Sequence, residues 1–193
     1  MSGAAQTRTV WPESLLRGAL LTASESVLRL ELGEPDPVTQ LECSRVRSAI
    51  DRALAHIAES TLPLGSVLIV SAPECASDVV VEQVLAALLA GNRLAISHHG
   101  SLGRAARVAL DALQRCSPPG VLRQFENEAF RLEWAHIAIV ILTPTRVFLN
   151  ETPWVSWQFD GSDSTAGTID FYRRHHDAAH GGARHLLEPE FAG

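Results

Sequence analysis

Residues 67–96, which read VLIVSAPECASDVVVEQVLAALLAGNRLAI, decide the fold of this protein. Val67 to Val70 are all apolar and three of the four are β-branched, which is typical of a strand buried on both faces of a parallel sheet. The largely apolar stretch from Val79 to Ala90 predicts a buried helix, with Ser77 as its N-cap and Gly91 at its end. The run that follows predicts a second strand, so the segment has the order strand, helix, strand.

The same unit repeats further along the chain. An amphipathic helix is predicted over Ser101–Arg115, and strands are predicted over Val121–Phe125 and Ile137–Leu142. Weaker strand and helix patterns follow after Thr143. Because crossovers between parallel strands are right-handed, we predict an α/β fold: a Rossmann-like, mostly parallel sheet with helices on both faces.

Two helical patterns precede this core. Apolar residues recur at intervals of three and four over Glu13–Leu32 and again over Val38–Glu59, with a turn rich in proline between them. We therefore expect an N-terminal helical segment packed on the core, the Rossmann-like core itself, and a C-terminal extension with an edge strand, a short helix and a flexible tail. These three parts are residues 1–61, 62–150 and 151–193.

The composition excludes several classes of function. The 193 residues are 46% hydrophobic and 20% charged, as in globular proteins. Every one of the 16 Lys and Arg positions is an arginine, so a lysine Schiff base or a phosphate-loop lysine is excluded for this stretch of chain. Arginine cannot replace lysine in such roles because it stays protonated. The formal net charge of −6, with arginines spread along the sequence, argues against a nucleic-acid partner.

The cysteines predict a reducing compartment. Cys43, Cys75 and Cys116 are an odd number at wide spacing, and no C-x-x-C pair occurs, so neither a disulfide framework nor a thiolate zinc site is indicated. The first eleven residues contain no apolar core of signal-peptide length, and the apolar run Ala19-Leu20-Leu21 is far too short to span a bilayer. We expect a cytoplasmic protein with no membrane partner.

The segment Val67–Leu142 resembles the nucleotide-binding domain of the aldehyde dehydrogenase superfamily. In that family a helix rich in alanine and leucine ends in Ala-Gly-Asn directly before the second strand, and Leu85–Ile96 has this pattern. The Pro118-Pro119-Gly120-Val121 turn before the third strand also matches the family. The resemblance implies a Rossmann-like fold and a cofactor site for NAD(P) at the ends of the strands.

The sequence departs from the family at that cofactor site. The lysine that holds the adenosine ribose in catalytic members is replaced by Ser97, and the loop after the first strand lacks the asparagine that stabilises an oxyanion. By the resemblance, the cofactor positions of this chain are Ser71, Pro73, Ser97, His98 and His99. These departures predict that no cofactor is bound.

The resemblance also bears on catalysis. A complete aldehyde dehydrogenase carries its cysteine nucleophile in a second domain, and no cysteine follows Leu142 in this sequence. The chain is similar to the non-catalytic, aldehyde-dehydrogenase-like C-terminal domain of bifunctional proline-utilization enzymes, which serves as a cover and an association surface. We therefore expect a non-catalytic protein that acts by oligomerisation or by association with a partner enzyme.

Two alternatives remain open. Cys75 follows the first strand and precedes a helix, where thiol pKa values are lowered and ligands bind, so it is the candidate nucleophile of a divergent NAD(P)- or acyl-CoA-binding oxidoreductase. The alternative, which we favour, is that Cys75 is a small thiol that only packs in a loop. His176 and His180, four residues apart on a predicted helix, are candidate metal ligands that need a third ligand. The competing interpretation is that both are solvated surface residues that bind no metal.

Overall fold

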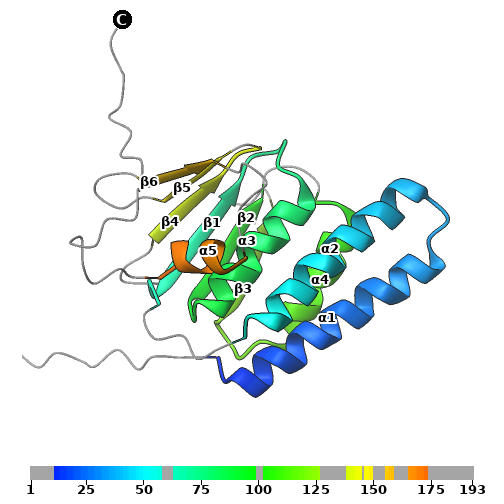
Figure 1. Cartoon of the computed structure of the whole chain (residues 1–193), viewed down its shortest axis with the longest axis horizontal. Coiled ribbons are helices and arrows are strands. Elements are labelled where there is room, and N and C mark those ends of the chain that lie inside the picture. The colour runs from blue at the N-terminus through cyan, green and yellow to red at the C-terminus, as the bar shows by residue number, and fades with distance from the viewer. Residues whose placement is uncertain are drawn as a thin grey trace, which may run out of the picture.

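The computed structural model of this protein describes residues 11–57, 63–98, 102–126, 138–144, 146–149, 155–158 and 165–173. These ranges contain five helices and six strands (Figure 1). The helices are α1 (Glu13–Gly33), α2 (Pro37–Ala55), α3 (Ser77–Leu89), α4 (Arg104–Cys116) and α5 (Thr165–Phe171). The strands are β1 (Ser66–Ser71), β2 (Arg93–His98), β3 (Leu122–Glu126), β4 (Ala138–Leu142), β5 (Arg146–Leu149) and β6 (Val155–Gln158).

The strands form one sheet in the order β3-β2-β1-β4-β5-β6. Strands β1 to β4 are parallel neighbours, whereas β5 and β6 are added to one side as antiparallel strands. Short connections join the last three strands, and such connections suit antiparallel pairing, whereas parallel neighbours need a long crossover. The predicted fold class, a Rossmann-like and mostly parallel sheet preceded by a helical segment, is confirmed.

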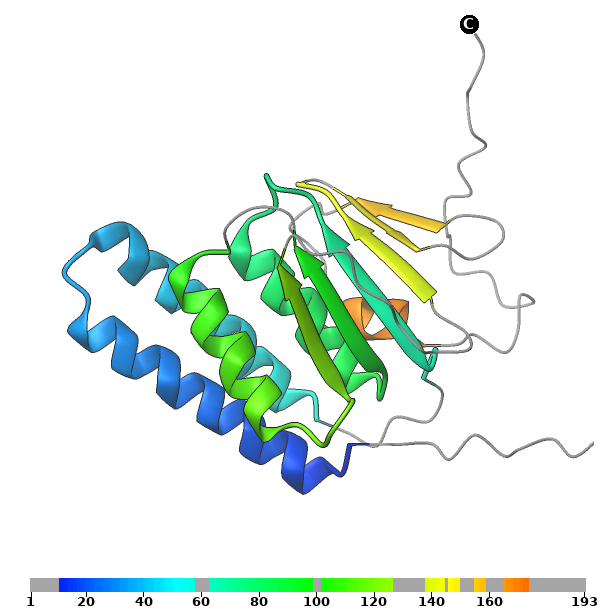
Figure 2. The same cartoon turned by 180° about the vertical axis from the view of Figure 1, so that it is seen from behind.

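The described helices lie in two layers on one face of the sheet (Figures 1 and 2). Helices α3 and α4 cover the sheet, with α5 beside α3, while α1 packs on α4 and α2 packs on α3. We expected helices on both faces of the sheet. Within the described ranges, the helices lie on one face only. None of the helices in these ranges is long and apolar enough to cross a membrane.

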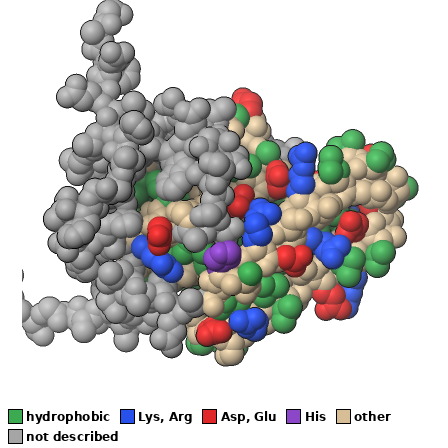
Figure 3. Space-filling view, viewed as in Figure 1, with side chains coloured by type: hydrophobic (Ala, Val, Ile, Leu, Met, Phe, Trp, Pro, Cys, Tyr) green, Lys and Arg blue, Asp and Glu red, His purple; other side chains and the backbone are tan. Residues whose placement is uncertain are grey.

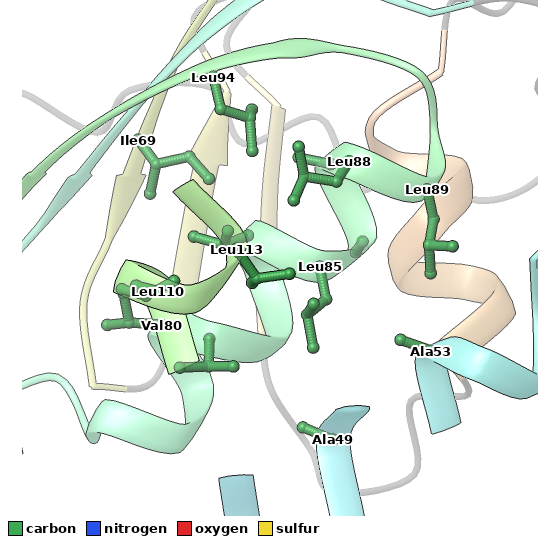
Figure 4. Packing of buried hydrophobic residues seen from close by; sticks show 14 of the residues in the cluster. Ala49, Ala53, Ile69, Val80, Leu85, Leu88, Leu89, Leu94, Leu110 and Leu113 are labelled. Carbon is green, nitrogen blue, oxygen red and sulfur yellow. The ribbon is translucent and has the colours of Figure 1, made fainter. Parts of the chain in front are cut away.

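Helix α3 is buried nearly all round because it lies between the sheet and α2. Every residue of α3 from Gln83 to Leu89 is buried. Figure 4 shows its leucines among Ile69 and Leu94 from the sheet and Ala49 and Ala53 from α2. A fully buried leucine contributes about 2 kcal/mol through removal of its side chain from water, so this sandwiched helix is the centre of the core.

The Ala-Gly-Asn turn ends α3. Gly91 has a φ of +84°, a left-handed conformation that favours glycine. Its N–H donates to the carbonyl of Leu88 at 2.9 Å, and the N–H of Asn92 donates to the carbonyl of Ala87 at 3.2 Å. These two bonds form a Schellman motif, which satisfies the last carbonyls of the helix.

The side chain of Asn92 joins three separate segments. It is only 2% exposed. Its Oδ1 accepts a hydrogen bond from the N–H of Gly65 at 2.9 Å, and its Nδ2 donates to the carbonyls of Ala87 at 3.1 Å and Tyr172 at 3.0 Å. The hydroxyl of Tyr172 in turn donates to Oε1 of Gln83 at 2.8 Å. Asn92 therefore connects the start of β1, the end of α3 and the residue that follows α5.

The turn between α1 and α2 is explained by its local sequence. Asp36 is the N-cap of α2, and its carboxylate accepts hydrogen bonds from the N–H groups of Val38 at 3.3 Å and Thr39 at 3.0 Å. Pro37 occupies the first helical position, where its missing N–H costs nothing. Thr39 donates hydrogen bonds to Asp36 from its hydroxyl and from its N–H, and these bonds hold the pKa of the Asp36 carboxyl below its ordinary value. The bond from the hydroxyl has the larger effect.

Candidate functional site

The candidate site lies where β1 and β2 end and the chain continues to α3 and α4. In open parallel sheets ligands bind at this carboxyl edge. Ser71, the last residue of β1, is the register partner of His98, the last residue of β2, so the structure brings these two candidates together. Both are buried, with exposed fractions of 2% and 5%. His99 lies outside the described residues.

Ser97 does not join Ser71 and His98. Successive side chains of a strand point to opposite faces, so Ser97 faces away from the side that Ile96 and His98 share. Ile96 belongs to the core beneath α3 and α4, which puts Ser71 and His98 on the helix-covered face. The five candidate positions therefore do not form one cluster in the described part of the chain.

The loop between β1 and α3 positions Cys75 against the core. Pro73 and Glu74 are exposed, while Cys75 is half-buried and packs on the hydrophobic core. The N–H of Cys75 donates to the carbonyl of Ala72 at 3.1 Å, which closes a tight turn. Burial raises the pKa of the Cys75 thiol above its ordinary value, and a separate hydrogen bond between the thiol and the backbone of Ala72 offsets only part of this effect. The charge of Glu74 raises the pKa further.

The N-terminus of α3 differs from the prediction. The N-cap is Ala76, which has no capping side chain, so the expectation of Ser77 as N-cap is wrong. The hydroxyl oxygen of Ser77 instead accepts a hydrogen bond from the N–H of Gly103 at 2.8 Å. This bond joins the start of α3 to the start of α4. Because the two residues are far apart in sequence, local sequence patterns do not predict it.

A carboxylate from another helix occupies the N-terminus of α4. Glu42, which lies in α2, accepts hydrogen bonds from the N–H groups of Ala105 at 3.4 Å and Ala106 at 3.3 Å. Helix N-termini attract anions because their first N–H groups have no partner within the helix and carry the positive end of the helix dipole. Glu42 therefore acts as an internal anion at α4.

Gly103 makes room for this carboxylate. It is the N-cap of α4 and has a φ of −58°, so glycine is not required by its backbone conformation. A Cβ atom at Gly103 would meet the carboxylate group of Glu42 closer than van der Waals contact allows. An ion pair lies nearby, between Arg104 and Glu34, the residue that follows α1. The α1–α2 pair is thus attached to the start of α4 by two acidic side chains.

The charges around the two helix starts are predominantly acidic. Glu74 is exposed before α3, Asp78 lies in the first turn of α3, and Glu42 sits on the first turn of α4. These carboxylates are negative and interact favourably with the positive ends of the helix dipoles. The phosphates of a cofactor would carry the same sign of charge. A pyrophosphate at this edge would have to displace Glu42 or lie close to other carboxylates.

Sequence analysis missed Glu42 and Gly103. Gly103 falls inside the helix predicted over Ser101–Arg115, whereas α4 begins at Arg104. A glycine directly before a helical run is a usable signal for an N-cap. The contact with Glu42 joins residues far apart in sequence and leaves no local signal.

The candidate metal ligands His176 and His180 lie outside the described residues. Within the ranges that the structure describes, no group of three or more His, Cys, Asp or Glu side chains is arranged to hold a metal ion. The three cysteines all fall within these ranges, and all three are free thiols.

Comparison with known proteins returns similar structures but no related sequence. No family model and no curated protein matches the chain. Similar solved structures include an NADP-bound glyceraldehyde-3-phosphate dehydrogenase from Methanocaldococcus jannaschii, with 15% identity, 68% of this chain covered and a TM-score of 0.44. They also include an NAD-dependent benzaldehyde dehydrogenase from Corynebacterium glutamicum, with 14% identity, 61% covered and a TM-score of 0.48.

A third similar structure is proline utilization A from Bradyrhizobium japonicum, with 19% identity, 61% of this chain covered and a TM-score of 0.45. The matched regions make up 42%, 32% and 15% of the lengths of these three proteins, in the order given. This chain therefore spans less than half of each. The first two are named as dehydrogenases of glyceraldehyde-3-phosphate and of benzaldehyde.

Proposed function

We propose that this chain is a non-catalytic protein on an aldehyde-dehydrogenase-like scaffold, which acts by association with itself or with a partner enzyme. The observation that carries the proposal is the carboxylate of Glu42 on the N–H groups of Ala105 and Ala106. A helix start at the carboxyl edge of a parallel sheet is where this class of fold offers amides to a ligand anion. Here the amides of α4 already have an anionic partner from the same chain.

The neighbouring residues support the same proposal. Glu74 and Asp78 add negative charge beside the start of α3, which disfavours the phosphates of NAD(P) or acyl-CoA. The raised pKa of Cys75 keeps the thiol protonated at neutral pH, whereas nucleophilic cysteines need a lowered pKa. A residue that packs on the core with a raised pKa fits a structural role better than a catalytic one.

The second candidate is a divergent NAD(P)- or acyl-CoA-binding oxidoreductase. One observation favours it: Ser71 and His98 end adjacent strands in register on the same face, which brings a hydroxyl and an imidazole together at the ligand edge. In this reading Cys75 or Ser71 acts with His98, and ligand binding moves Glu42 away from α4. Metal binding by His176 and His180 is the weaker third candidate, and elemental analysis of the purified protein tests it.

Calorimetric titration separates the first two candidates. NAD, NADP and an acyl-CoA are added in turn to the full chain and to Cys75→Ser as a matched control. The proposal predicts no saturable heat up to about 1 mM ligand, where even a weak site with a Kd of 1 mM would be half filled. It also predicts no reduction of NAD with an aldehyde present. Saturable binding, or turnover that Cys75→Ser abolishes, would establish the oxidoreductase instead.

We also propose that the association takes place in the cytoplasm. The support is that Cys43, Cys75 and Cys116 are all free thiols, as is usual in a reducing compartment. The net charge of −6 disfavours nucleic acid as the partner, because binding to phosphate backbones needs clustered positive charge. A protein surface is therefore the expected partner, and fractionation of cells followed by detection of the chain tests the compartment.

A further inference from the structure

Helix α1 has apolar residues on two opposite sides. Its buried side, which packs on α4 and α2, consists of Leu16, Ala19, Leu20, Ala23 and Val27. Leu21, Leu28 and Leu32 lie elsewhere on the helix, at spacings of seven and four residues. At about 100° per residue these three fall within about 40° of one another, on the side away from the core. Leu21 is 54% exposed and Leu32 is 80% exposed, while Leu28 is half-buried.

Together with Gly18 and Glu25, these leucines form what we call the outer stripe of α1: Gly18, Leu21, Glu25, Leu28 and Leu32. The intervals are three, four, three and four residues, which is the spacing that places residues on one seam between two packed helices. A Cβ atom at Gly18 would meet nothing within 4 Å, so this end of the stripe is open to close approach. The stripe therefore has the pattern of a seam between two packed helices. Within the described residues, no other helix packs on it.

The apolar surface continues from the stripe onto α2. Val38, at the start of α2, is 74% exposed, and Leu41 is 54% exposed. Figure 3 shows hydrophobic side chains among charged ones at the end of the α1–α2 pair where the two helices are joined. Scattered single apolar residues on a surface are ordinary, but a periodic row next to further exposed apolar residues marks an interaction surface.

The outer stripe is complementary to itself when two copies of α1 run antiparallel. With a two-fold axis between residues 26 and 27, Leu21 of one copy faces Leu32 of the other, at both ends of the contact. Glu25 and Arg29 form an ion pair within the helix at 2.6 Å, and both side chains are well exposed, at 62% and 75%. The same axis brings Glu25 of each copy close to Arg29 of the other, so four charges alternate in sign across the centre.

We propose that two copies of this chain associate through the outer stripe of α1, with the two helices antiparallel. The inference rests on the proposed function, which requires an association surface, and names the surface and the partner. A second copy is the occupant because the stripe supplies the apolar residues, and Glu25 with its neighbour Arg29 supplies both signs of charge, as an isologous two-fold interface requires. Leucines at both ends of the seam supply the apolar contact, and the alternating charges at its centre favour the antiparallel arrangement.

Sedimentation of the full chain tests the surface. The chain is expected to sediment as a dimer at about 100 µM, a concentration that populates even a weak interface with a Kd near 10 µM. The double variant Leu21→Glu with Leu32→Glu is expected to be monomeric, because it places like charges opposite one another. Leu15→Glu is the matched control: Leu15 is also on α1 and 53% exposed, but lies off the stripe, so this variant is expected to remain dimeric.

Cross-linking tests the antiparallel orientation. Leu21→Cys and Leu32→Cys are made singly in a Cys116→Ser background, because Cys116 is the exposed native thiol and Cys43 is buried. One of the two proteins carries a tag, and the mixture is treated with a short bis-maleimide. The antiparallel seam predicts a cross-link between the Leu21→Cys and Leu32→Cys chains in preference to links between identical chains, and the background protein alone shows how far Cys75 reacts.

Each result has a defined meaning. A monomeric wild type at about 100 µM, or a dimer that Leu21→Glu with Leu32→Glu leaves intact, overturns the interface on α1. Cross-links only between identical variants overturn the antiparallel arrangement. Circular dichroism of the charged variants checks that they are folded. None of these outcomes depends on nucleotide binding, so the calorimetric test of the proposed function can fail or succeed separately.

Discussion

Replacing Gly103 with alanine tests how α4 is capped. The backbone at Gly103 has a φ of −58°, which alanine adopts freely, so the cost comes from the Cβ atom that meets the carboxylate of Glu42. Because a carboxylate at the end of a flexible side chain can move, Gly103→Ala is expected to expel Glu42 from the N–H groups of Ala105 and Ala106. The substitution therefore removes a cap that lies on a different helix.

The size of the effect follows from the geometry. An ordinary N-cap contributes about 1 kcal/mol to stability. Glu42 makes two such bonds, but their N–H···O distances of 3.4 and 3.3 Å are long. Glu42→Ala should therefore cost about as much as the loss of one ordinary cap, about 1 kcal/mol. Gly103→Ala should cost about 1.5 kcal/mol, because alanine is also a poorer N-cap residue than glycine. In the Glu42→Ala background the same Gly103→Ala change should cost only about 0.5 kcal/mol, since no carboxylate remains to be displaced.

Urea unfolding followed by circular dichroism measures these differences. The comparison includes the wild type, both single variants and the double variant. Where their m-values are equal, a shift of the unfolding midpoint reports a change in stability. The double variant should be about 1 kcal/mol more stable than the sum of the single effects predicts, because the two residues act on one contact. If the two costs add within about 0.3 kcal/mol, Gly103 and Glu42 are independent and the capping argument is refuted.

Three further experiments test the rest of the structure. Asn92→Ala should lower the unfolding free energy by about 2–4 kcal/mol in a urea titration, because it removes the side-chain donor to the carbonyl of buried Tyr172 and the acceptor of the Gly65 N–H; a loss under about 1 kcal/mol would contradict its joining role. Tyr172→Phe should cost about 1 kcal/mol at pH 7 through the lost bond to Gln83. Burial raises the pKa of Tyr172 well above 10.0, so the stability that the neutral phenol contributes is complete below pH 10 and is lost as pH rises above it. Wild type should therefore lose up to about 1.4 kcal/mol per pH unit above pH 10 relative to Tyr172→Phe, and parallel pH profiles would exclude this. Mass spectrometry of iodoacetamide labelling at pH 7 should show exposed Cys116 modified before Cys75, whose pKa is raised; faster labelling of Cys75 would indicate an activated thiol.

Local sequence patterns were sufficient for most of the core. The apolar run at Val67 predicts β1 because a strand buried on both faces needs no alternation, and the apolar helix after it is buried because it lies between two layers. Gly91 and Asn92 end α3 as expected, because the left-handed turn is a property of these two residues themselves. In each of these cases the information lies within a few residues of the element it determines.

The candidate site could be predicted only in part. Ser71 and His98 meet because parallel strands align their ends, which the strand positions already imply. Ser97 is separated from them by the alternation of side chains along β2. The contact of Glu42 with α4 and the bond between Ser77 and Gly103 depend on how distant helices pack, so they follow only from the three-dimensional structure.

The central claim is that this scaffold associates with protein instead of binding a dinucleotide. Native mass spectrometry of the full chain with NAD present in excess tests both halves of the claim in one measurement. The account predicts the mass of a dimer, or of a complex with a partner, with no added mass of NAD. A monomer that carries one NAD would contradict it.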